Sequence, residues 1–523
     1  MSESTTAPQA GRKEWIGLAV IALPCLLYSL DLTVLNVAVP QLSADLQPSS
    51  SQLLWIIDIY GFLVAGFLIT MGTLGDRIGR RRLLMFGAFA FGAGSLLAAF
   101  STSAEMLITA RALLGVAGAT LAPSTLSLIF NMFHDPQQRT FAVGVWIASY
   151  SGGAVVGPVI GGLLLEFFWW GSVFLLAVPV MALLLVLGPV LLPEFRNPNA
   201  GRIDLTSVVL SLASVLTAVY GLKEIAKDGV EWLPVLSILA GIVLAVAFVS
   251  RQKRLAEPLL DLDLFRIPAF SASLGAYALS FGVMFGGYVF VLQHLQLVLG
   301  YSPLGAGAWM VPSGIGFVLG GIVTPPLVKR LPPGLVMAAG LALAAVGFGG
   351  LATVHETSST AFVAFTFAVL AFGVTPVFTL ATDLIVGAVP RERAGVAASV
   401  SETGAEFGGA MGIAVFGSIG VAVYRGRLED SIPAGVPPEQ AAAARDTLGA
   451  ANEAAAQLPG DLGAALLAAA NDAFAAGLQI SAVIGAVLLA ALAVVVAALV
   501  RHVRPAAAVE AQAEAAGVPV PAS

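Results

Sequence analysis

Apolar and polar positions alternate along this chain in blocks far longer than a soluble helix or strand requires. Fourteen predominantly apolar stretches are separated by polar segments, and each approaches the length of about 20 residues that a helix needs to cross a bilayer. The pattern predicts membrane spans at residues 15–40, 53–75, 83–101, 105–130, 140–165, 170–192, 205–223, 232–250, 270–299, 305–328, 334–354, 360–388, 394–424 and 476–500. The chain is therefore predicted to be an all-α membrane protein with 14 transmembrane helices.

The basic residues fix the orientation of these spans. If the N-terminus is cytoplasmic, 19 of the 25 Lys and Arg residues fall in cytoplasmic segments. Arg111 lies within the fourth span, and five basic residues fall in outer segments: Lys223, Lys227, Arg425, Arg427 and Arg445. Because short cytoplasmic loops carry an excess of Lys and Arg, the distribution predicts that both termini are cytoplasmic.

Composition narrows the class of protein. Of 523 residues, 58% are hydrophobic and 11% are charged, with a mean hydropathy of +0.92, whereas soluble domains carry about 25% charged residues. Cys25 is the only cysteine, so no intrachain disulfide and no cysteine-based metal site is expected. The sequence lacks a Walker A loop, which disfavours an ATP-driven pump. We expect no enzymatic activity, no metal, no cofactor and no nucleic-acid partner.

Weak internal repetition indicates the domain organisation. The segment GTLGDRIGRRRL at 72–83 has a counterpart at 320–334, and the segment at 123–144 has one at 378–399. Internal repeats around a central site are typical of transporters. The repeats predict two six-helix halves with two helices inserted between them, a 6 + 2 + 6 arrangement. The predicted domains are an N-terminal bundle at 1–193, inserted linker helices at 194–266, a C-terminal bundle at 267–504 and a flexible cytoplasmic tail at 505–523.

The C-terminal bundle contains one long polar connection, residues 425–475, which the topology places outside the membrane. It is rich in alanine, above all at 440–457. Both a disordered loop and a small ordered hairpin are compatible with this composition.

Four acidic residues lie inside the predicted spans: Asp31, Asp58, Glu402 and Glu406. A carboxylate at the bilayer centre costs roughly 2.5–3.5 kcal/mol even on lenient insertion scales, and such residues usually face the bundle interior, where protons and cations use them. Their presence predicts a protein that moves something across the membrane, and it favours a positively charged substrate.

Two of these sites suggest specific chemistry. Glu402 and Glu406 lie one helical turn apart on the same face, so in a low dielectric the two carboxylates do not both ionise readily and titrate as a unit. Asp58 lies between Trp55 and Tyr60, and aromatic faces beside a carboxylate suit a flat lipophilic cation. Competition between a proton and a cation for one carboxylate is antiport in outline.

A tight cytoplasmic turn follows the second span, in the sequence GTLGDRIGRRR beginning at Gly72. Its glycines permit a sharp reversal of the chain and close helix approach. This string resembles the signature loop of the major facilitator superfamily, in which the loop helps to close the cytoplasmic side. The resemblance implies a cytoplasmic gate formed by Gly72, Asp76, Arg77, Gly79 and Arg80. Asp383 lies near the cytoplasmic end of the twelfth span, where pairing with Arg391 or Arg393 or a hydrated gate position is expected.

Three further motifs extend the resemblance over residues 20–500. The string LDLTVLNVAVP at 30–40 is similar to the first-helix motif of the 14-helix drug:proton antiporters of the QacA, SmvA and LfrA type. Arg111 and the glycines after it resemble the fourth-helix motif, in which the arginine is implicated in proton transfer. The fifth-helix antiporter motif is matched by GAVVGPVIGG, that is by Gly153, Gly157, Pro158, Gly161 and Gly162. Generic packing of small residues would explain these glycines equally well.

The resemblance implies a major facilitator fold and a function. We expect a proton-coupled antiporter that exports lipophilic and quaternary-ammonium cations by alternating access. It would work as a monomer in the bacterial cytoplasmic membrane, with the proton gradient as its energy source. Substrate and protons would bind at Asp31, Asp58, Glu402, Glu406 and Arg111, with Trp55 and Tyr60 in the cavity.

One departure from relatives and two alternatives remain. The tenth span, 305–328, carries no carboxylate, whereas some relatives have one there, which leaves the handling of dications open. A dedicated exporter of a self-made antibiotic or metabolite is the first alternative function, and a membrane sensor that does not transport is the second.

Overall fold

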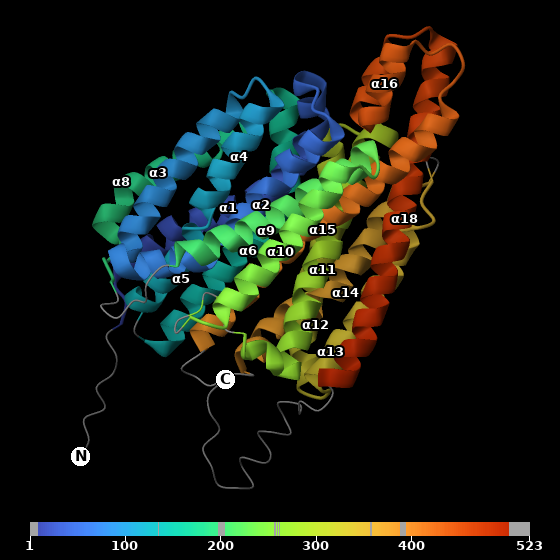
Figure 1. The fold of residues 1–523 in the computed structure, drawn as a ribbon. Coiled ribbons are helices and arrows are strands. Elements are labelled where there is room, and N and C mark those ends of the chain that lie inside the picture. The colour runs from blue at the N-terminus through green and yellow to red at the C-terminus, as the bar shows by residue number, and fades with distance from the viewer. Residues whose placement is uncertain are drawn as a thin grey trace, which may run out of the picture. The chain divides into compact units, whose positions relative to one another are not determined.

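The computed structural model describes residues 9–133, 135–196, 204–255, 258, 260, 262–355, 358–387 and 394–500, apart from some side chains within these ranges. Every regular element among these residues is a helix (Figure 1). The chain forms two compact units, and each is described by itself.

The first unit comprises Met1–Leu259, Leu295–Ala308 and Pro437–Gly463. Its helices are α1 (Arg12–Leu46), α2 (Ser50–Ile78), α3 (Arg80–Ala99), α4 (Ala104–Gly118), α5 (Leu121–Met132), α6 (Pro136–Phe167), α7 (Ser172–Leu175), α8 (Ala177–Leu191), α9 (Leu205–Asp228), α10 (Trp232–Gln252), α16 (Pro438–Asp446) and α17 (Leu448–Ala456). Within it, α1 packs on α6, α2 on α4, and α9 on both α10 and α2. The predicted inserted helices, α9 and α10, thus cluster with the first six spans.

The second unit comprises Leu260–His294, Trp309–Val436 and Ala464–Ser523. Its helices are η1 (Leu264–Arg266), α11 (Pro268–Gln293), α13 (Pro333–Leu351), α14 (Thr360–Gly387), α15 (Ala394–Ser431), most of α12 (Pro303–Val328) and most of α18 (Gly460–Val500). A short π-helix, η2 (His294–Val298), follows α11. The main packing pairs are α11 with α15 and α13 with α14.

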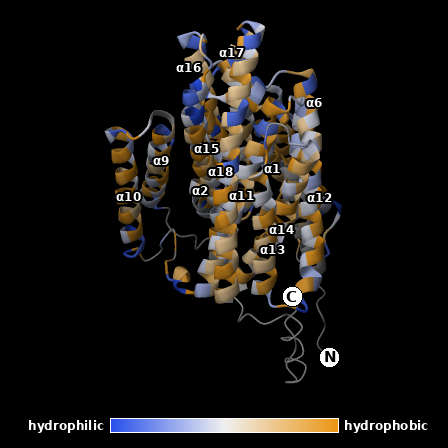
Figure 2. Cartoon of the chain, turned by 90° about the vertical axis from the view of Figure 1, so that its right-hand side faces the viewer, coloured by the Kyte–Doolittle hydropathy of each residue, from blue (hydrophilic) through white to orange (hydrophobic). Residues whose placement is uncertain are grey.

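The lengths of the helices fit a bilayer. Thirteen helices within the described residues are long and apolar enough to span a membrane, and Figure 2 shows apolar colours along most of their lengths. At the predicted fifth span α6 is 32 residues long, and its part Val156–Phe167 is a shorter apolar helix. The all-α membrane class is confirmed, while the count of 14 and the cytoplasmic termini stay predictions.

Two predicted spans are broken in the structure. The fourth is divided into α4 and α5 at Ala119 and Thr120, and the sixth consists of the single turn α7 followed by α8. For the connection at 425–475, the structure has the ordered alternative, since α15 continues to Ser431 and α16 and α17 pack on each other before α18 begins. The Thr447 hydroxyl caps α17 by accepting a hydrogen bond from the Ala450 N–H.

The reversal between α2 and α3 consists of one residue. Gly79 has a φ of 113°, in the region that favours glycine because it has no Cβ, and its N–H donates to the Gly75 carbonyl at 2.9 Å. The predicted tight turn is therefore present, and it brings the N-terminus of α3 directly against the end of α2.

Close packing in the second unit depends on facing glycines. A Cβ placed on Gly412 of α15 would overlap the backbone of Gly282 on α11, whereas a Cβ on Gly409 would meet only the Phe285 ring, at 3.6 Å. The backbones of α11 and α15 therefore approach each other at Gly282 and Gly412, as small residues allow in membranes.

We expect Gly412→Ala to destabilise the protein by about 1–3 kcal/mol, because the new methyl group forces two backbones apart. Gly409→Ala on the same helix is the matched control and should remain close to wild type. Thermal unfolding of the purified protein in detergent measures both variants. Equal stabilities would contradict the close contact of α11 and α15.

Candidate functional site

The first predicted acid forms a buried ion pair. Arg111 on α4 donates from Nη1 to the carboxylate of Asp31 on α1, and from Nε to the Ile56 carbonyl on α2 at 3.2 Å. Its guanidinium lies 4.6 Å from the centre of the Tyr60 ring. A Cβ on Gly115, one turn further along α4, would lie 2.7 Å from the Tyr60 carbonyl oxygen. The glycine therefore lets α4 approach α2 closely enough for Arg111 to join three helices.

The second predicted acid also has a basic partner, one that the sequence did not suggest. The ammonium of Lys223 on α9 lies 2.8 Å from Asp58 Oδ2 and 2.9 Å from Oδ1, and both side chains are fully buried. The same nitrogen lies 3.8 Å from the centre of the Trp55 ring. Asp58 and Trp55 are three residues apart on α2 and share a face. The ammonium thus lies between a carboxylate and an aromatic face.

This pair corrects the assignment of Lys223 to an outer segment. The predicted seventh span ends at residue 223, whereas α9 continues to Asp228 and buries the lysine. A hydropathy profile reads a lysine at the edge of an apolar stretch as the start of a loop. One feature of the sequence favours burial of this lysine: it lies near the end of a span that also contains polar residues.

Together the two pairs change the interpretation of Trp55 and Tyr60. Each aromatic ring is already in contact with a cation of the protein itself, Lys223 and Arg111 respectively. The sequence predicted a place for a substrate cation between Asp58 and aromatic faces, and in this structure the cation at that place belongs to the protein.

Further aromatic residues surround the first pair, and the sequence analysis missed them. Tyr28 lies 6.0 Å from Tyr60 and 5.5 Å from Tyr150, measured between ring centres, and Trp146 lies 4.7 Å from Tyr150. These residues come from α1, α2 and α6. No spacing in the sequence distinguishes them from other aromatic residues in membrane helices.

The glycines of the predicted antiporter motif bring α6 against α1. A Cβ on Gly153 would overlap the Leu26 carbonyl, and one on Gly157 would overlap the Thr33 hydroxyl. Gly161 meets Val34 of α1 in the same way. These contacts agree with the small-residue packing that the sequence left open, and no contact tests a separate role in antiport.

The remaining two motif residues face another segment of the first unit. A Cβ on Gly162 would lie 2.6 Å from Leu304 Cα, and one on Gly307 would meet the Pro158 carbonyl. Pro158 is inside α6, as predicted.

The loop that contains the predicted gate residues is held by Glu194, a residue that the sequence did not single out. Glu194, which follows α8, accepts a hydrogen bond from the Arg81 N–H at 3.2 Å and pairs with the Arg81 and Arg82 side chains at 3.6 and 3.7 Å. Arg80 donates to the Pro123 carbonyl at 3.2 Å. The loop is thus tied to the end of α8 and the start of α5.

The other gate residues show fewer contacts. A Cβ on Gly72 would lie 3.8 Å from the side chain of Pro123, and Arg77 is exposed. The side chains of Asp76 and Asp383 and the whole of Arg391 and Arg393 lie outside the described residues, so the roles predicted for these residues are not tested.

In the second unit, the structure places both predicted glutamates beside α11. Glu402 is exposed and Glu406 is half-buried on α15, and Tyr277 on α11 interacts electrostatically with both. A Cβ on Gly408 of α15 would overlap the backbone of Ala278, so the two helices touch at this level. The carboxylates and Tyr277 therefore belong to one cluster.

Tyr277 is the first member of an aromatic wall, which we define as Tyr277, Phe281, Phe285, Phe317 and Phe378. The Phe281 ring stacks on Phe378 at 4.2 Å and on Phe285 at 5.8 Å between centres. Tyr277 meets Phe281 edge-on at 5.0 Å, and Phe317 lies 5.9 Å from Phe378. The wall joins α11, α12 and α14, and it was missed in the sequence because Phe317 and Phe378 lie on helices far along the chain from Tyr277, Phe281 and Phe285.

The hairpin of α9 and α10 is closed by a polar cluster outside the membrane-spanning part of α9. Arg251 donates from two nitrogens to the Asp204 carboxylate, each at 2.9 Å, and the Ser207 hydroxyl donates to it at 2.6 Å. These hydrogen bonds, those from Arg251 above all, lower the pKa of Asp204 to about 2.

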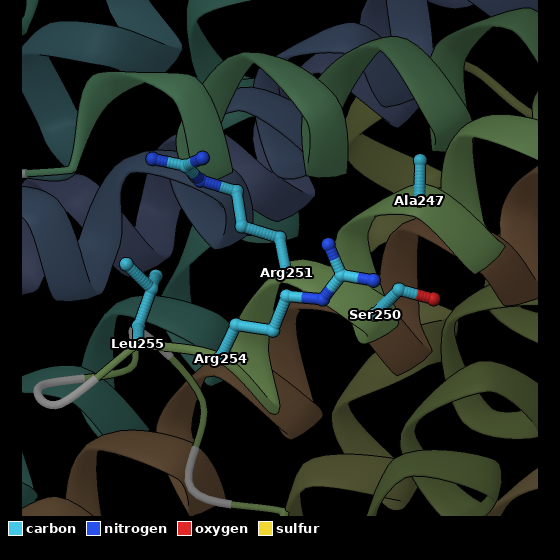
Figure 3. A pocket seen from close by; sticks show the side chains of 5 residues that line it. All are labelled: Ala247, Ser250, Arg251, Arg254 and Leu255. Carbon is cyan, nitrogen blue, oxygen red and sulfur yellow. The ribbon is translucent and has the colours of Figure 1, made fainter.

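A shallow hollow of about 320 Å³ adjoins this cluster and is lined by Ala247, Ser250, Arg251, Arg254 and Leu255. Figure 3 shows its two guanidinium groups pointing in different directions. None of the predicted acids lies in it.

Comparisons with known proteins agree with the motifs. Residues 21–413 match the model of the Major Facilitator Superfamily. The chain is 44% identical over 490 residues to the multidrug efflux pump LfrA of Mycolicibacterium smegmatis, covering 94% of this chain and 97% of LfrA. It is 36% identical over 463 residues to the methyl viologen resistance protein SmvA of Salmonella typhimurium, covering 88% of this chain and 93% of SmvA.

The fold is also similar to a solved structure. A bacterial homologue of the human lysosomal transporter Spinster, in an inward-facing and unoccupied conformation, superposes with a TM-score of 0.65 at 18% identity, covering 95% of this chain and 99% of that one. The matches to the family model and to LfrA and SmvA confirm the resemblance drawn from the motifs.

The pair of Asp31 and Arg111 predicts a double-mutant signature. Arg111→Met leaves the Asp31 carboxylate buried alone, so we expect a loss of about 3–5 kcal/mol of stability. Asp31→Asn combined with Arg111→Met removes both charges and should recover most of this loss. Asp45→Asn on α1 is the control, because the amide oxygen can still accept the hydrogen bond from Trp170. Thermal unfolding of the wild type, Arg111→Met, Asp31→Asn and the double variant gives the coupling, and additive effects would contradict the ion pair.

We expect the contribution of the Asp204 cluster to the stability of the protein to be independent of pH in the physiological range. The lowered pKa means that the stabilisation is present above the ordinary pKa of about 4 and is lost only as the pH falls towards 2. Asp204→Asn removes a partly exposed pair and should cost about 1 kcal/mol or less. Thermal unfolding of both proteins from about pH 5 to about pH 9 should show a constant difference, and a difference that varies within this range would contradict the assignment.

Proposed function

The chain belongs to the major facilitator superfamily, and we propose that it exports lipophilic and quaternary-ammonium cations in exchange for protons. The observation that carries this proposal is the position of Glu402 and Glu406 beside the aromatic wall. Their carboxylates attract a positive charge, and the stacked rings of the wall offer apolar faces to the rest of the ligand. An aromatic face also attracts a cation electrostatically, by about 0.5–2 kcal/mol depending on its exposure to water.

The exposure of the residue Glu402 distinguishes this cluster from the first unit. Among the described residues, no Lys or Arg forms an ion pair with Glu402, whereas Asp31 and Asp58 each have one. A carboxylate that can be reached by a ligand and has aromatic rings beside it is better suited to receive a cation from outside. We therefore assign the entry of substrate to the glutamate cluster.

The names of the relatives support a drug as substrate. LfrA is called a multidrug efflux pump and SmvA a methyl viologen resistance protein. Methyl viologen is a flat aromatic cation, and such a molecule has the shape and charge that the aromatic wall and the carboxylates would bind. Because methyl viologen carries two charges, a test of substrates should include both monocations and dications.

Coupling to protons follows from competition at the carboxylates. A bound proton removes the charge that attracts the cation, so the proton and the cation favour opposite states of the site. A pump of this kind would bind the drug from the cytoplasm, release protons there and take up protons from the outside before the next cycle. Arg111 would assist proton transfer near Asp31, and the loop at Gly79 would help to close the cytoplasmic side.

Transport is tested with purified protein in proteoliposomes. An imposed pH gradient, acidic inside for protein whose cytoplasmic face points outward, should drive ethidium into the vesicles, and a protonophore should stop it. Accumulation of one metabolite but of no cation from a varied panel would favour a dedicated exporter, and no flux of any compound would favour a sensor. Equal flux with and without the pH gradient would overturn proton coupling.

Binding to the glutamates should vary with pH in a defined direction. Because a cation favours the ionised carboxylates, affinity for tetraphenylphosphonium should rise from about pH 5 to about pH 9 in the wild type. Glu402→Gln removes one charge, so we expect weaker binding, by about tenfold, and a smaller dependence on pH. The same loss in Glu406→Gln would show that the pair acts as a unit.

Calorimetry of the purified proteins measures these affinities. Glu439→Gln on the exposed surface of α16 is the control and should bind as the wild type does. Affinity that does not change with pH in the wild type would show that the glutamates do not exchange a proton for the cation.

A further inference from the structure

Lys223 presents a cation to the place where a cationic substrate would be expected. Its ammonium is 2.8 Å from a carboxylate oxygen of Asp58 and 3.8 Å from the centre of the Trp55 ring. A carboxylate on one side and an aromatic face on the other are the features by which a protein binds an organic ammonium ion. The lysine thus makes the contacts that such a ligand would make.

The lysine comes from a helix outside the two six-helix repeats. It lies on α9, the first helix of the inserted pair, which packs on α2 beside Asp58. Next to it, Glu224 accepts a hydrogen bond from the Ser51 hydroxyl at 2.8 Å, close to the start of α2. Contact between α9 and α2 is therefore held by one buried ion pair and one hydrogen bond at neighbouring residues.

No other charged group replaces Lys223 as the direct partner of Asp58 within the described part of the chain. Arg111 acts on Asp58 only through space, because its own nitrogens donate to Asp31 and to the Ile56 carbonyl. If Lys223 withdrew, the buried Asp58 carboxylate beside Trp55 would lose its positive partner, and binding of a cation or a proton would become favourable there.

We propose that Lys223 is a tethered competitor that occupies the cation site of Asp58 and Trp55 and that a cationic substrate must displace. A group attached to the protein competes at an effective concentration in the millimolar range or above. Only a cation with extra binding energy, such as one with several aromatic rings, displaces it, while small hydrated cations do not. The lysine would therefore set specificity, and α9 would move when the site is filled. This inference rests on the proposed function.

The alternative is an ion pair that only holds α9 to α2. A structural pair of this kind predicts that removal of the lysine lowers stability and leaves cation binding unchanged or weaker. The competitor predicts the opposite effect on binding, so affinity for a cation distinguishes the two roles.

The first experiment measures tetraphenylphosphonium binding to the purified full-length protein by calorimetry. We expect Lys223→Met to bind at least tenfold more tightly than the wild type, and Asp58→Asn combined with Lys223→Met to lose that gain. Lys223→Arg retains a cation and should bind weakly, as the wild type does. Glu224→Gln, at the neighbouring position, should leave the affinity unchanged. Unchanged or weaker binding to Lys223→Met, in protein that is folded by thermal unfolding, would overturn the proposal.

The second experiment needs no variant and so does not depend on the folding of Lys223→Met. Reductive methylation of the wild-type protein, followed by mass spectrometry, reports which lysines are accessible. Saturating tetraphenylphosphonium should increase methylation of Lys223 at least severalfold and leave that of Lys253, near the end of α10, unchanged. Equal or reduced methylation of Lys223 would overturn the proposal. Absence of tetraphenylphosphonium binding to every variant, together with absence of its transport, would overturn the proposed function itself.

Discussion

Neutralisation of charge in a low dielectric is the constraint on which the first unit depends. An isolated ion in a membrane interior costs several kcal/mol, and an opposite charge with good hydrogen-bond geometry offsets this cost. Arg111 meets this requirement for Asp31, and Lys223 meets it for Asp58. Because the partners lie on different helices, each pair also ties two helices together: α4 to α1, and α9 to α2. Gly115 lets α4 approach α2 closely enough for Arg111 to reach the Asp31 carboxylate and the Ile56 carbonyl.

The second unit uses its acids differently. Glu402 is exposed, and the aromatic wall beside it consists of rings stacked on each other. A protein that binds cations needs at least one carboxylate that its own basic residues have not already satisfied. The contrast with Asp31 and Asp58 therefore gives a physical reason for assigning different tasks to the two units, with capture of the ligand assigned to the glutamates and a competed site to Asp58.

Much of the fold could be predicted from the sequence, because short stretches of the chain carry the signals. The bilayer thickness sets the length of each apolar stretch, and Gly79 alone forms the reversal between α2 and α3. A run of about 20 apolar residues and a glycine at a one-residue turn are visible without knowledge of the rest of the chain. Contacts between distant segments could not be predicted in this way. Lys223 lies 165 residues from Asp58, and Phe378 is far from Phe281 in the chain. Hydropathy also misread Lys223 as a loop residue, because it measures the cost of a charge without considering a partner that removes it.

Neutralisation of charge also concerns α9 and α10, the two helices that the sequence predicts to be inserted between the six-helix repeats. On α10 many apolar side chains are exposed, as expected for contact with lipid, among them Val243, Val246 and Leu239. Most of α9 is at least partly exposed, yet Lys223 on it is 1% exposed. A helix that only fills space beside a bundle has no need of a buried charge, and burying one without Asp58 would be strongly unfavourable. The ion pair therefore makes the inserted helix and the acid of α2 dependent on each other. A change in the charge of Asp58, whether by a proton or by a bound cation, acts directly on the contact that holds α9 in place.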